Sequence, residues 1–255
     1  DHPNIAQLLS NIAALNVLRG NYDKAEELFE RSLIIRKKAF GEEHQSVAEG
    51  LGSLGGLYKA LGEYGKAESF YKRSLEIFEK NLGPEHPLVA VNLNFMGVLY
   101  AEMGDYSKAE QHYQRSLAIN EKVFGQMHPT VAQTLNNMGE LYRKIGDYAK
   151  AEQHYLRSLE IAKKVFGLEH VDLALYLSNL ALLYDSVREA EPLYKRSIQI
   201  YEKTLGLEHP LLATTLNNLA LHYSYFGEFS KAEPLYKRAL AIQEKILGTE
   251  HPNVS

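Results

Sequence analysis

The chain has 255 residues, with 28 Lys and Arg against 32 Asp and Glu, so its formal net charge is −4. This mild acidity argues against a nucleic-acid partner, because proteins that bind phosphate backbones present a basic surface. No apolar run approaches the roughly 20 residues of a membrane span, and the absence of cysteine excludes disulfides, thiolate metal sites and cysteine nucleophiles. The first ten residues carry neither the basic start nor the apolar centre of a signal peptide.

One sequence motif recurs along the whole chain with a nearly constant period. A histidine marks the start of each copy, and successive histidines are 42 residues apart, except for one spacing of 39. These residues are His2, His44, His86, His128, His170, His209 and His251. The period predicts one domain over 1–255 that is built of six repeats, approximately 2–43, 44–85, 86–127, 128–169, 170–208 and 209–250.

Each repeat predicts two helices. In the fourth repeat, Val131, Leu135 and Met138 follow helical spacing and form one apolar stripe. Gly146 is expected to end that helix, and a second stripe continues to Gly167, which we expect to be a left-handed cap. Pro129, directly after His128, suits the first turn of a helix because its missing N–H is not needed there.

Small and aromatic residues recur at fixed positions of both helices. The first helix carries a small residue at Ala13, Gly55, Gly97, Gly139, Ala181 and Ala220. The second carries one at Ala25, Ala67, Ala109, Ala151, Ala190 and Ala232. The aromatic residues are Tyr58, Tyr100, Tyr142, Tyr184 and Tyr223 in the first helix and Phe29, Tyr71, Tyr113, Tyr155, Tyr194 and Tyr236 in the second. We expect the small residues to let the two helices approach closely and the aromatic residues to fill the core.

These columns resemble the consensus of the tetratricopeptide repeat (TPR), in its long variety of about 42 residues. The phrases SNLALLY (178–184), LNNLALHY (216–223) and GLEHP (206–210) are similar to those of kinesin light chains and nephrocystin-like proteins. The resemblance implies an all-α, right-handed α-α superhelix of six helix-turn-helix repeats and about twelve helices. It also implies a non-catalytic cytoplasmic protein whose partner is a protein or peptide, as in cargo or adaptor recognition.

Other kinds of site find little support in the sequence. Residues 50–55 spell a literal GxGxxG, but they lie inside an expected helix rather than after a strand, so they do not predict a nucleotide site. The repeated histidines stand at least one helix-packing distance of roughly 8–10 Å apart, too far to share a zinc ion. No acid–base or nucleophile constellation stands out from the repeat pattern. We therefore expect no metal, no cofactor and no enzymatic activity.

The second helices carry one arginine per repeat, and two interpretations are open. These residues are Arg31, Arg73, Arg115, Arg157, Arg196 and Arg238. A ladder of ion pairs with Asp or Glu of adjacent helices is the preferred interpretation. A groove-facing row of charges for an acidic peptide is the alternative.

Asparagines in the first helices give the strongest functional signal, because Asn is not favoured in mid-helix. By offset from the core stripe, the positions that should point into the concave groove are Ser10/Asn11, Gly52/Ser53, Asn94/Phe95, Asn136/Asn137, Ser178/Asn179 and Asn217/Asn218. An amide offers a donor and an acceptor to a peptide backbone, and the resemblance implies the same contact. The predicted peptide-binding residues are Asn94, Gln133, Asn136, Asn137, Glu140, Arg143, Lys144, Asn179, Asn217 and Asn218. Alternatively, one Asn of each pair braces the neighbouring repeat.

Two repeats depart from the pattern. The fifth lacks the three residues that would complete its turn, which predicts a shortened first helix near Asp185 or a distorted turn at Ser186–Val187; the alternative is that three residues of the natural chain are absent from this sequence. The second carries Gly50, Gly52, Gly55 and Gly56 in one helix, of which only Gly55 is expected to need a small residue. That helix should therefore open more readily than its equivalents.

Both ends of the sequence read as the start of a repeat, at Asp1-His2-Pro3 and at Glu250-His251-Pro252, so we expect a fragment of a longer chain. Two further functions stay open. One is a regulatory segment of a larger signalling protein, for example a bacterial one. The other is a scaffold that associates with itself through exposed solenoid ends.

Overall fold

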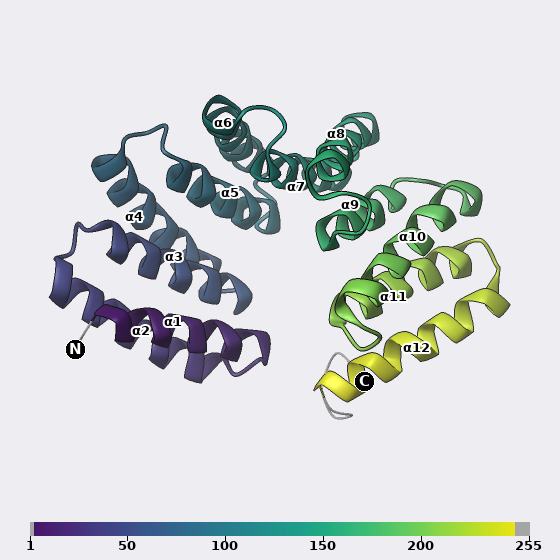
Figure 1. Ribbon diagram of the computed structural model, residues 1–255, viewed down its shortest axis with the longest axis horizontal. Coiled ribbons are helices and arrows are strands. Elements are labelled where there is room, and N and C mark those ends of the chain that lie inside the picture. The colour runs from purple at the N-terminus through teal and green to yellow at the C-terminus, as the bar shows by residue number, and fades with distance from the viewer. Residues whose placement is uncertain (1–2, 248–255) are drawn as a thin grey trace. The chain divides into compact units, whose positions relative to one another are not determined.

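The computed structural model describes residues 3–247, and within them it contains helices and short connections without a β-strand (Figure 1). The twelve helices of this part are α1 (Pro3–Leu18), α2 (Tyr22–Phe40), α3 (Gln45–Ala60), α4 (Tyr64–Leu82), α5 (Pro87–Glu102), α6 (Tyr106–Phe124), α7 (Pro129–Ile145), α8 (Tyr148–Phe166), α9 (Val171–Ala181), α10 (Val187–Leu205), α11 (Pro210–Tyr225) and α12 (Phe229–Leu247). The all-α prediction is confirmed. His2, His251 and the predicted repeat starts at both ends lie outside the described residues.

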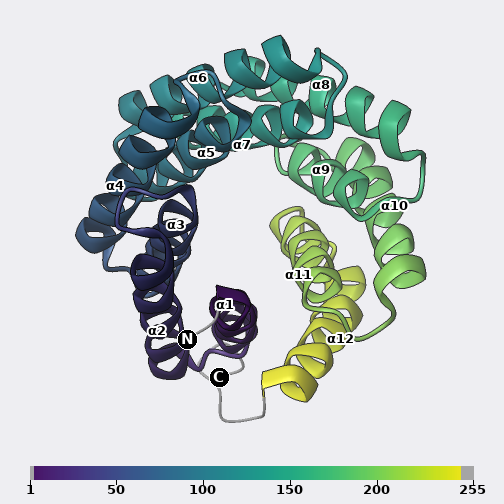
Figure 2. The ribbon, with the colours of Figure 1, turned by 60° about the vertical axis from the view of Figure 1, so that its left-hand side comes forward.

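The chain divides into two compact halves, residues 1–126 and 127–255. In the N-terminal half, α1, α3 and α5 each pack on the helix that follows, and α2 and α4 pack in turn on α3 and α5. The C-terminal half repeats this order with α7 to α12. Figure 2 shows the resulting two layers within each half, with the odd-numbered helices in one layer and the even-numbered helices in the other. Among the described helices, none is long and apolar enough to cross a membrane.

The repeated histidine caps the first helix of its repeat. In each case the ring Nδ1 accepts a hydrogen bond from the backbone N–H two residues later, over 3.1–3.3 Å. The capping residues are His44, His86, His128, His170 and His209, each with extended backbone. The cap satisfies one of the N–H groups that a helix start leaves without a partner. Sequence reasoning recognised these histidines only as markers of the period.

Glycine ends most helices, as predicted, although not always with the expected geometry. Gly146 ends α7 with φ 87° and ψ 8°, which is the left-handed conformation. Gly167 ends α8 with φ 82° but ψ −170°, so the prediction of a left-handed helical cap there is wrong. The chain at Gly167 leaves the helix in an extended direction that still requires positive φ.

The small–aromatic columns pack as predicted. A Cβ built on Gly139 would lie 2.6 Å from the ring of Tyr155, so this glycine makes room for the aromatic side chain of α8. Gly55 and Gly97 stand in the same relation to Tyr71 and Tyr113. The prediction that only Gly55 needs to be small in α3 is incomplete. A Cβ at Gly50 would lie 3.2 Å from Leu33 Cδ1, because α2 approaches α3 closely at that point.

Two sets of polar bonds hold the helices together that the sequence analysis did not predict. Within a repeat, a fully buried serine of the second helix donates to a carbonyl of the first, as from Ser74 to Ala48 over 2.8 Å. The other such bonds are Ser32 to Ala6, Ser116 to Ala90 and Ser197 to Ala174. Between repeats, a tyrosine hydroxyl donates to a glutamate of the preceding helix, as from Tyr100 to Glu68 over 2.8 Å and from Tyr184 to Glu152 over 2.9 Å.

The fifth repeat departs from the others as predicted. Helix α9 has 11 residues and ends at Ala181, whereas the first helices of the other repeats have 16 or 17. Ser186 then caps α10, with its hydroxyl accepting from the Glu189 N–H over 3.3 Å. The missing residues are thus absorbed by a shortened first helix and a new cap.

Candidate functional site

The clearest hollow of the N-terminal half lies along its odd-numbered helices. It is a cavity of about 690 Å³ between α1, α3 and α5, open to solvent. Among the groove positions predicted from sequence, Ser10, Asn11, Gly52, Ser53 and Phe95 line it. The predicted site residue Asn94 is buried, as is its neighbour Leu93. In this half, five of the six predicted groove positions therefore line the cavity, whereas Asn94 is not among the lining residues.

Gly52 and Gly56 line this cavity without contributing side chains. A Cβ on Gly52 would meet only Ser74 Oγ, at 3.7 Å, and one on Gly56 only the Tyr71 hydroxyl, at 3.6 Å. Both are ordinary contact distances, so neither glycine is required by packing. The equivalent positions of other repeats carry larger residues. Asn94, Asn136 and Asn217 match Gly52, and Val98, Glu140, Leu182 and Leu221 match Gly56.

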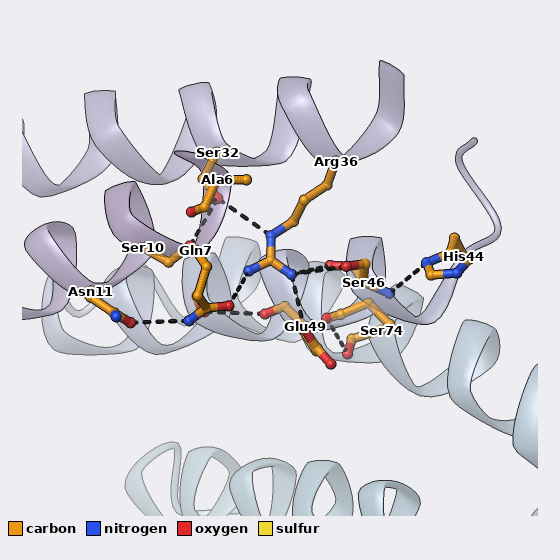
Figure 3. Close-up of polar contacts among 12 residues, drawn as sticks. Ala6, Gln7, Ser10, Asn11, Ser32, Arg36, His44, Ser46, Glu49 and Ser74 are labelled. Carbon is orange, nitrogen blue, oxygen red and sulfur yellow. Dashed lines mark hydrogen bonds and ion pairs between the residues drawn. The ribbon is translucent and has the colours of Figure 1, made fainter. Parts of the chain in front are cut away.

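Arg36 of α2 forms one wall of the cavity and ties three helices together (Figure 3). Its side chain is almost fully buried, yet each guanidinium nitrogen has a partner. It donates to Gln7 Oε1 of α1 over 2.9 Å and to Glu49 Oε2 of α3 over 2.9 Å. The Ser46 carbonyl accepts a further bond over 2.9 Å. A buried arginine that is paired in this way contributes little free charge to the cavity.

Asn92 of α5 is the one cavity-lining residue, among those described, with a buried side-chain atom that lacks a hydrogen-bond partner. Its Nδ2 donates to Ser74 Oγ over 2.7 Å. Because Ser74 uses its own proton for the Ala48 carbonyl, it must accept from the amide, and this fixes the orientation of Asn92. Its Oδ1 therefore points away from Ser74 and remains an unused acceptor.

In the C-terminal half, the predicted asparagines form a row along α7, α9 and α11. Asn179 Nδ2 donates to Asn136 Oδ1 over 3.0 Å, so this pair braces neighbouring repeats. Asn136 is buried, while Asn137, Asn179, Asn217 and Asn218 are half-buried. The brace that was weighed from sequence is thus present for one pair, and it leaves Asn179 Oδ1 available.

The predicted charged residues of α7 are partly engaged with one another. Arg143 donates to both carboxylate oxygens of Glu140, over 2.7 and 2.8 Å, and the Tyr155 hydroxyl donates to Glu140 over 3.1 Å. Burial raises the pKa of Glu140, but the bond and charge of Arg143, the bond from Tyr155 and the charge of Lys144 together outweigh burial and hold this pKa below its usual value. The same bond raises the pKa of Arg143. Lys144 and Gln133 are exposed, so the expected basic spot depends mainly on Lys144.

The arginine column lies on the even-numbered helices, and Arg73, Arg115 and Arg238 form ion pairs with glutamates, as the ladder interpretation predicts. Arg115 donates to Glu79 over 2.6 Å, and Arg238 pairs with Glu202 over 2.7 Å. Arg73 pairs with Glu43 and Glu76, while Arg196 donates to the Leu168 carbonyl over 2.9 Å. Within the described residues, no group of three or more His, Asp or Glu side chains could hold a metal ion.

Comparison with known families identifies the repeat. The tetratricopeptide repeat family matches residues 4–80, 47–122, 130–188 and 186–245, which together span most of the sequence. The chain belongs to this family. A search of curated protein sequences returned no match. The recognition of a TPR protein from its small and aromatic columns is therefore confirmed.

Solved structures show the same TPR fold. The chain is similar to BtubC (BKLC) from P. vanneervenii, with 26% identity over 94% of both chains and a TM-score of 0.68. It is similar to a putative kinesin light chain from P. anserina, with 22% identity over 96% of this chain and 98% of the other, and a TM-score of 0.52. Aspartyl phosphate phosphatase F from Bacillus subtilis shares 15% identity, with a TM-score of 0.73, over 97% of this chain and 62% of the phosphatase.

Sequence reasoning missed three features of this TPR groove. It placed Gly52 at the groove but treated Gly56 only as a weak point of the helix, although both glycines line the cavity. It gave no role to Asn92, because the unused Oδ1 depends on the bonding of Ser74 in another helix. It did not consider Arg36, which stands outside the arginine column. An arginine among apolar positions of a helix, absent from the other repeats, was the available signal.

Proposed function

We propose that this TPR chain is a non-catalytic recognition module that binds an extended segment of a partner protein, as in kinesin-light-chain-like cargo or adaptor recognition. The observation that supports it best is the row of half-buried amides at one position of three successive first helices, Asn137, Asn179 and Asn218. Each amide can both donate to and accept from a peptide backbone. A backbone grip of this kind holds a segment whatever its side chains are.

Residues beside this row would read the side chains of the partner. Gln133 and Lys144 of α7 are exposed, and the Glu140–Arg143 pair lies half-buried between them along the helix. Since Arg143 is already neutralised by Glu140, we expect Lys144 to provide most of the attraction for an acidic residue. Asn136, which accepts from Asn179, would support the row rather than touch the ligand. Asn94 is buried in the N-terminal half.

A further fold relative supports a peptide ligand. The chain is similar to a Rap protein complexed with competence and sporulation factor, with 15% identity over 94% of this chain and 75% of the other, and a TM-score of 0.67. The likeness is one of fold. It means that a helical solenoid of this type can hold a signalling factor. We also propose a cytoplasmic location, as the resemblance to kinesin light chains implies.

Alanine substitution of the amide row tests the peptide grip. The probes are an array of overlapping decapeptides and, for the strongest of them, isothermal titration. Asn218→Ala is the most direct variant, because Asn218 bonds to no other side chain within the described residues. We expect this variant to reduce the binding free energy of every array peptide by about 1–3 kcal/mol. Gln153→Ala removes an amide from the exposed face of α8 and serves as the matched control.

Asn179→Ala distinguishes grip from bracing. Because this residue also donates to Asn136, we expect it to lower both the peptide affinity and the melting temperature. If Asn218→Ala leaves all affinities unchanged, or if Asn179→Ala lowers only the melting temperature, the amide row is structural. The proposal of a peptide grip would then be wrong.

Self-association is the second candidate function, and a specific surface favours it. Ile5, Leu8, Ile12 and Leu15 form an exposed apolar stripe on α1. The equivalent residues of α3 are buried against α2, for example Leu54 and Leu57. A second helix of another TPR repeat would cover this stripe. Light scattering across a concentration series tests it, and a constant monomer mass would exclude it.

The third candidate is a regulatory segment of a larger signalling protein. It is favoured by the fold match to aspartyl phosphate phosphatase F, of which this chain spans 62%. In that arrangement the groove would contact another part of the same polypeptide. Competition between such a part and an array peptide would reveal it.

A further inference from the structure

The cavity between α1, α3 and α5 differs chemically from the amide row of the C-terminal half. Apolar side chains occupy its rim, since Val91 and Phe95 of α5 are each more than 40% exposed. Leu88 and Val17 also line it. Gly52 and Gly56 line the cavity without side chains, and together they are called the glycine floor. Apolar groups that face an open cavity are typical of a site that is covered by a ligand.

The charges at this cavity are neutralised within the protein. Arg36 is paired with Glu49 over 2.9 Å, and Lys59 is paired with Glu102 over 3.0 Å. Neither a free positive charge nor a free negative charge is therefore offered to a ligand at the floor. The complementary ligand is uncharged where it enters, which separates it from the acidic segments that Lys144 would favour.

Among the described residues that line the cavity, Asn92 has the one buried polar side-chain atom without a partner in the protein. Asn92 is 3% exposed, and its Oδ1 has no partner although the amide is held in place by Ser74. A buried acceptor of this kind gains a bond when an N–H donor reaches it. An extended peptide supplies such a donor at almost every residue.

We propose that this cavity is a second recognition site, which binds an uncharged, apolar segment of a partner protein. An apolar side chain of that segment lies on the floor of Gly52 and Gly56, between Phe95 and α1, and a backbone N–H donates to Asn92 Oδ1. The absence of Cβ atoms at Gly52 and Gly56 lets the segment approach the α3 backbone. This inference rests on the proposed function, because it specifies the chemistry of a peptide ligand.

The repeats themselves supply substitutions that fill the cavity without breaking the fold. Leu182 and Leu221 occupy the position of Gly56 in the fifth and sixth repeats, so Gly56→Leu places a side chain that the TPR fold already carries there. Asn94 and Asn136 occupy the position of Gly52 in the third and fourth repeats, so Gly52→Asn is likewise a side chain that the fold already carries there. Thr134 and Thr215 occupy the position of Asn92 in the fourth and sixth repeats, which makes Asn92→Thr a suitable variant that removes the amide oxygen. All three variants should retain the helical circular dichroism of the wild type.

The probes are terminally blocked nonapeptides of Gly and Ser with Leu-Phe-Leu, Glu-Phe-Glu or Ser-Ser-Ser at the centre. Isothermal titration should detect Leu-Phe-Leu binding with a Kd of about 1 mM or below and much weaker binding of the other two. Gly56→Leu should lower the affinity for the Leu-Phe-Leu peptide by about tenfold or more, because the new leucine side chain then occupies the floor of the cavity. Asn92→Thr should weaken it by about threefold to tenfold.

Three results would overturn the inference. The first is a folded Gly56→Leu variant whose affinity for the Leu-Phe-Leu peptide differs from that of the wild type by less than about twofold. The second is the absence of Leu-Phe-Leu binding, and the third is equal binding of all three probes. Asn218→Ala separates this inference from the amide grip, because it should not alter Leu-Phe-Leu binding. If the array peptides respond to neither variant while Leu-Phe-Leu responds to Gly56→Leu, the grip fails and the apolar site stands.

Discussion

Helix α3 should be the least stable first helix of the protein, and its glycines make this testable. It carries four glycines, whereas α7 carries only Gly139. Each glycine inside a helix lowers stability by about 1 kcal/mol relative to alanine. Gly55 has its counterpart in Gly139, so the excess comes from Gly50, Gly52 and Gly56. We therefore expect residues 46–61 to exchange their amide hydrogens before residues 130–145.

The double variant Gly52→Ala/Gly56→Ala should reverse this weakness. The new methyl groups would lie 3.7 Å from Ser74 Oγ and 3.6 Å from the Tyr71 hydroxyl, so neither forces a displacement. Two such replacements should stabilise α3 by about 2 kcal/mol. At about 1.4 kcal/mol per tenfold change, this slows the local opening of α3 by roughly thirtyfold.

Hydrogen exchange followed by mass spectrometry measures this effect directly, on a peptide within residues 46–61. Gly55→Ala is the control, because its Cβ would lie 2.7 Å from the Tyr71 ring and should accelerate exchange instead. The reasoning is refuted if the double variant exchanges as fast as the wild type. It is also refuted if wild-type α3 and α7 are equally protected.

Three further predictions concern polar contacts. His86→Ala should lower the free energy of unfolding by about 1 kcal/mol, whereas His86→Asn should preserve the cap to the Leu88 N–H; urea unfolding measures both. The bond to Glu26 and burial raise the pKa of Tyr58 to about 12. The Tyr58 hydroxyl therefore contributes fully to the free energy of unfolding below about pH 10, the pKa of tyrosine in the unfolded chain, and this contribution is lost as the pH rises toward 12. Tyr58→Phe should remove this part of the loss of stability at alkaline pH. Arg36→Lys should lower stability by about 1–3 kcal/mol in thermal unfolding, because an ammonium cannot replace the guanidinium bonds.

The sequence predicted the parts of the structure that follow from period and side-chain size. The helix pairs, the contact between Gly139 and Tyr155, and the shortened helix of the fifth repeat all depend on residues near one another in the chain. Predicted groove positions such as Asn11 and Ser53 also line a cavity. These features could be predicted because residues that are one repeat apart in the sequence occupy equivalent positions in the fold.

What escaped prediction depends on the partners that the fold supplies. Asn136 and Asn179 are 43 residues apart, and sequence alone could not show which of the two amides donates. The unused Oδ1 of Asn92 follows from the bonding of Ser74, which is itself determined by a carbonyl of α3. Gly56 has the same sequence signature whether it weakens a helix or opens a cavity. Its role becomes visible only with the surrounding side chains in place.

The bonds that join the helices have a consequence for how the chain folds. The serine bonds connect residues 23 or 26 apart, the tyrosine bonds residues 32 apart, and the asparagine brace residues 43 apart, in a chain of 255 residues. Loops of this length close with little loss of chain entropy, and proteins with such local contacts fold rapidly. Folding can therefore begin in any repeat and spread to its neighbours through bonds of this kind. A slow refolding phase should reflect proline isomerisation rather than the search for distant contacts.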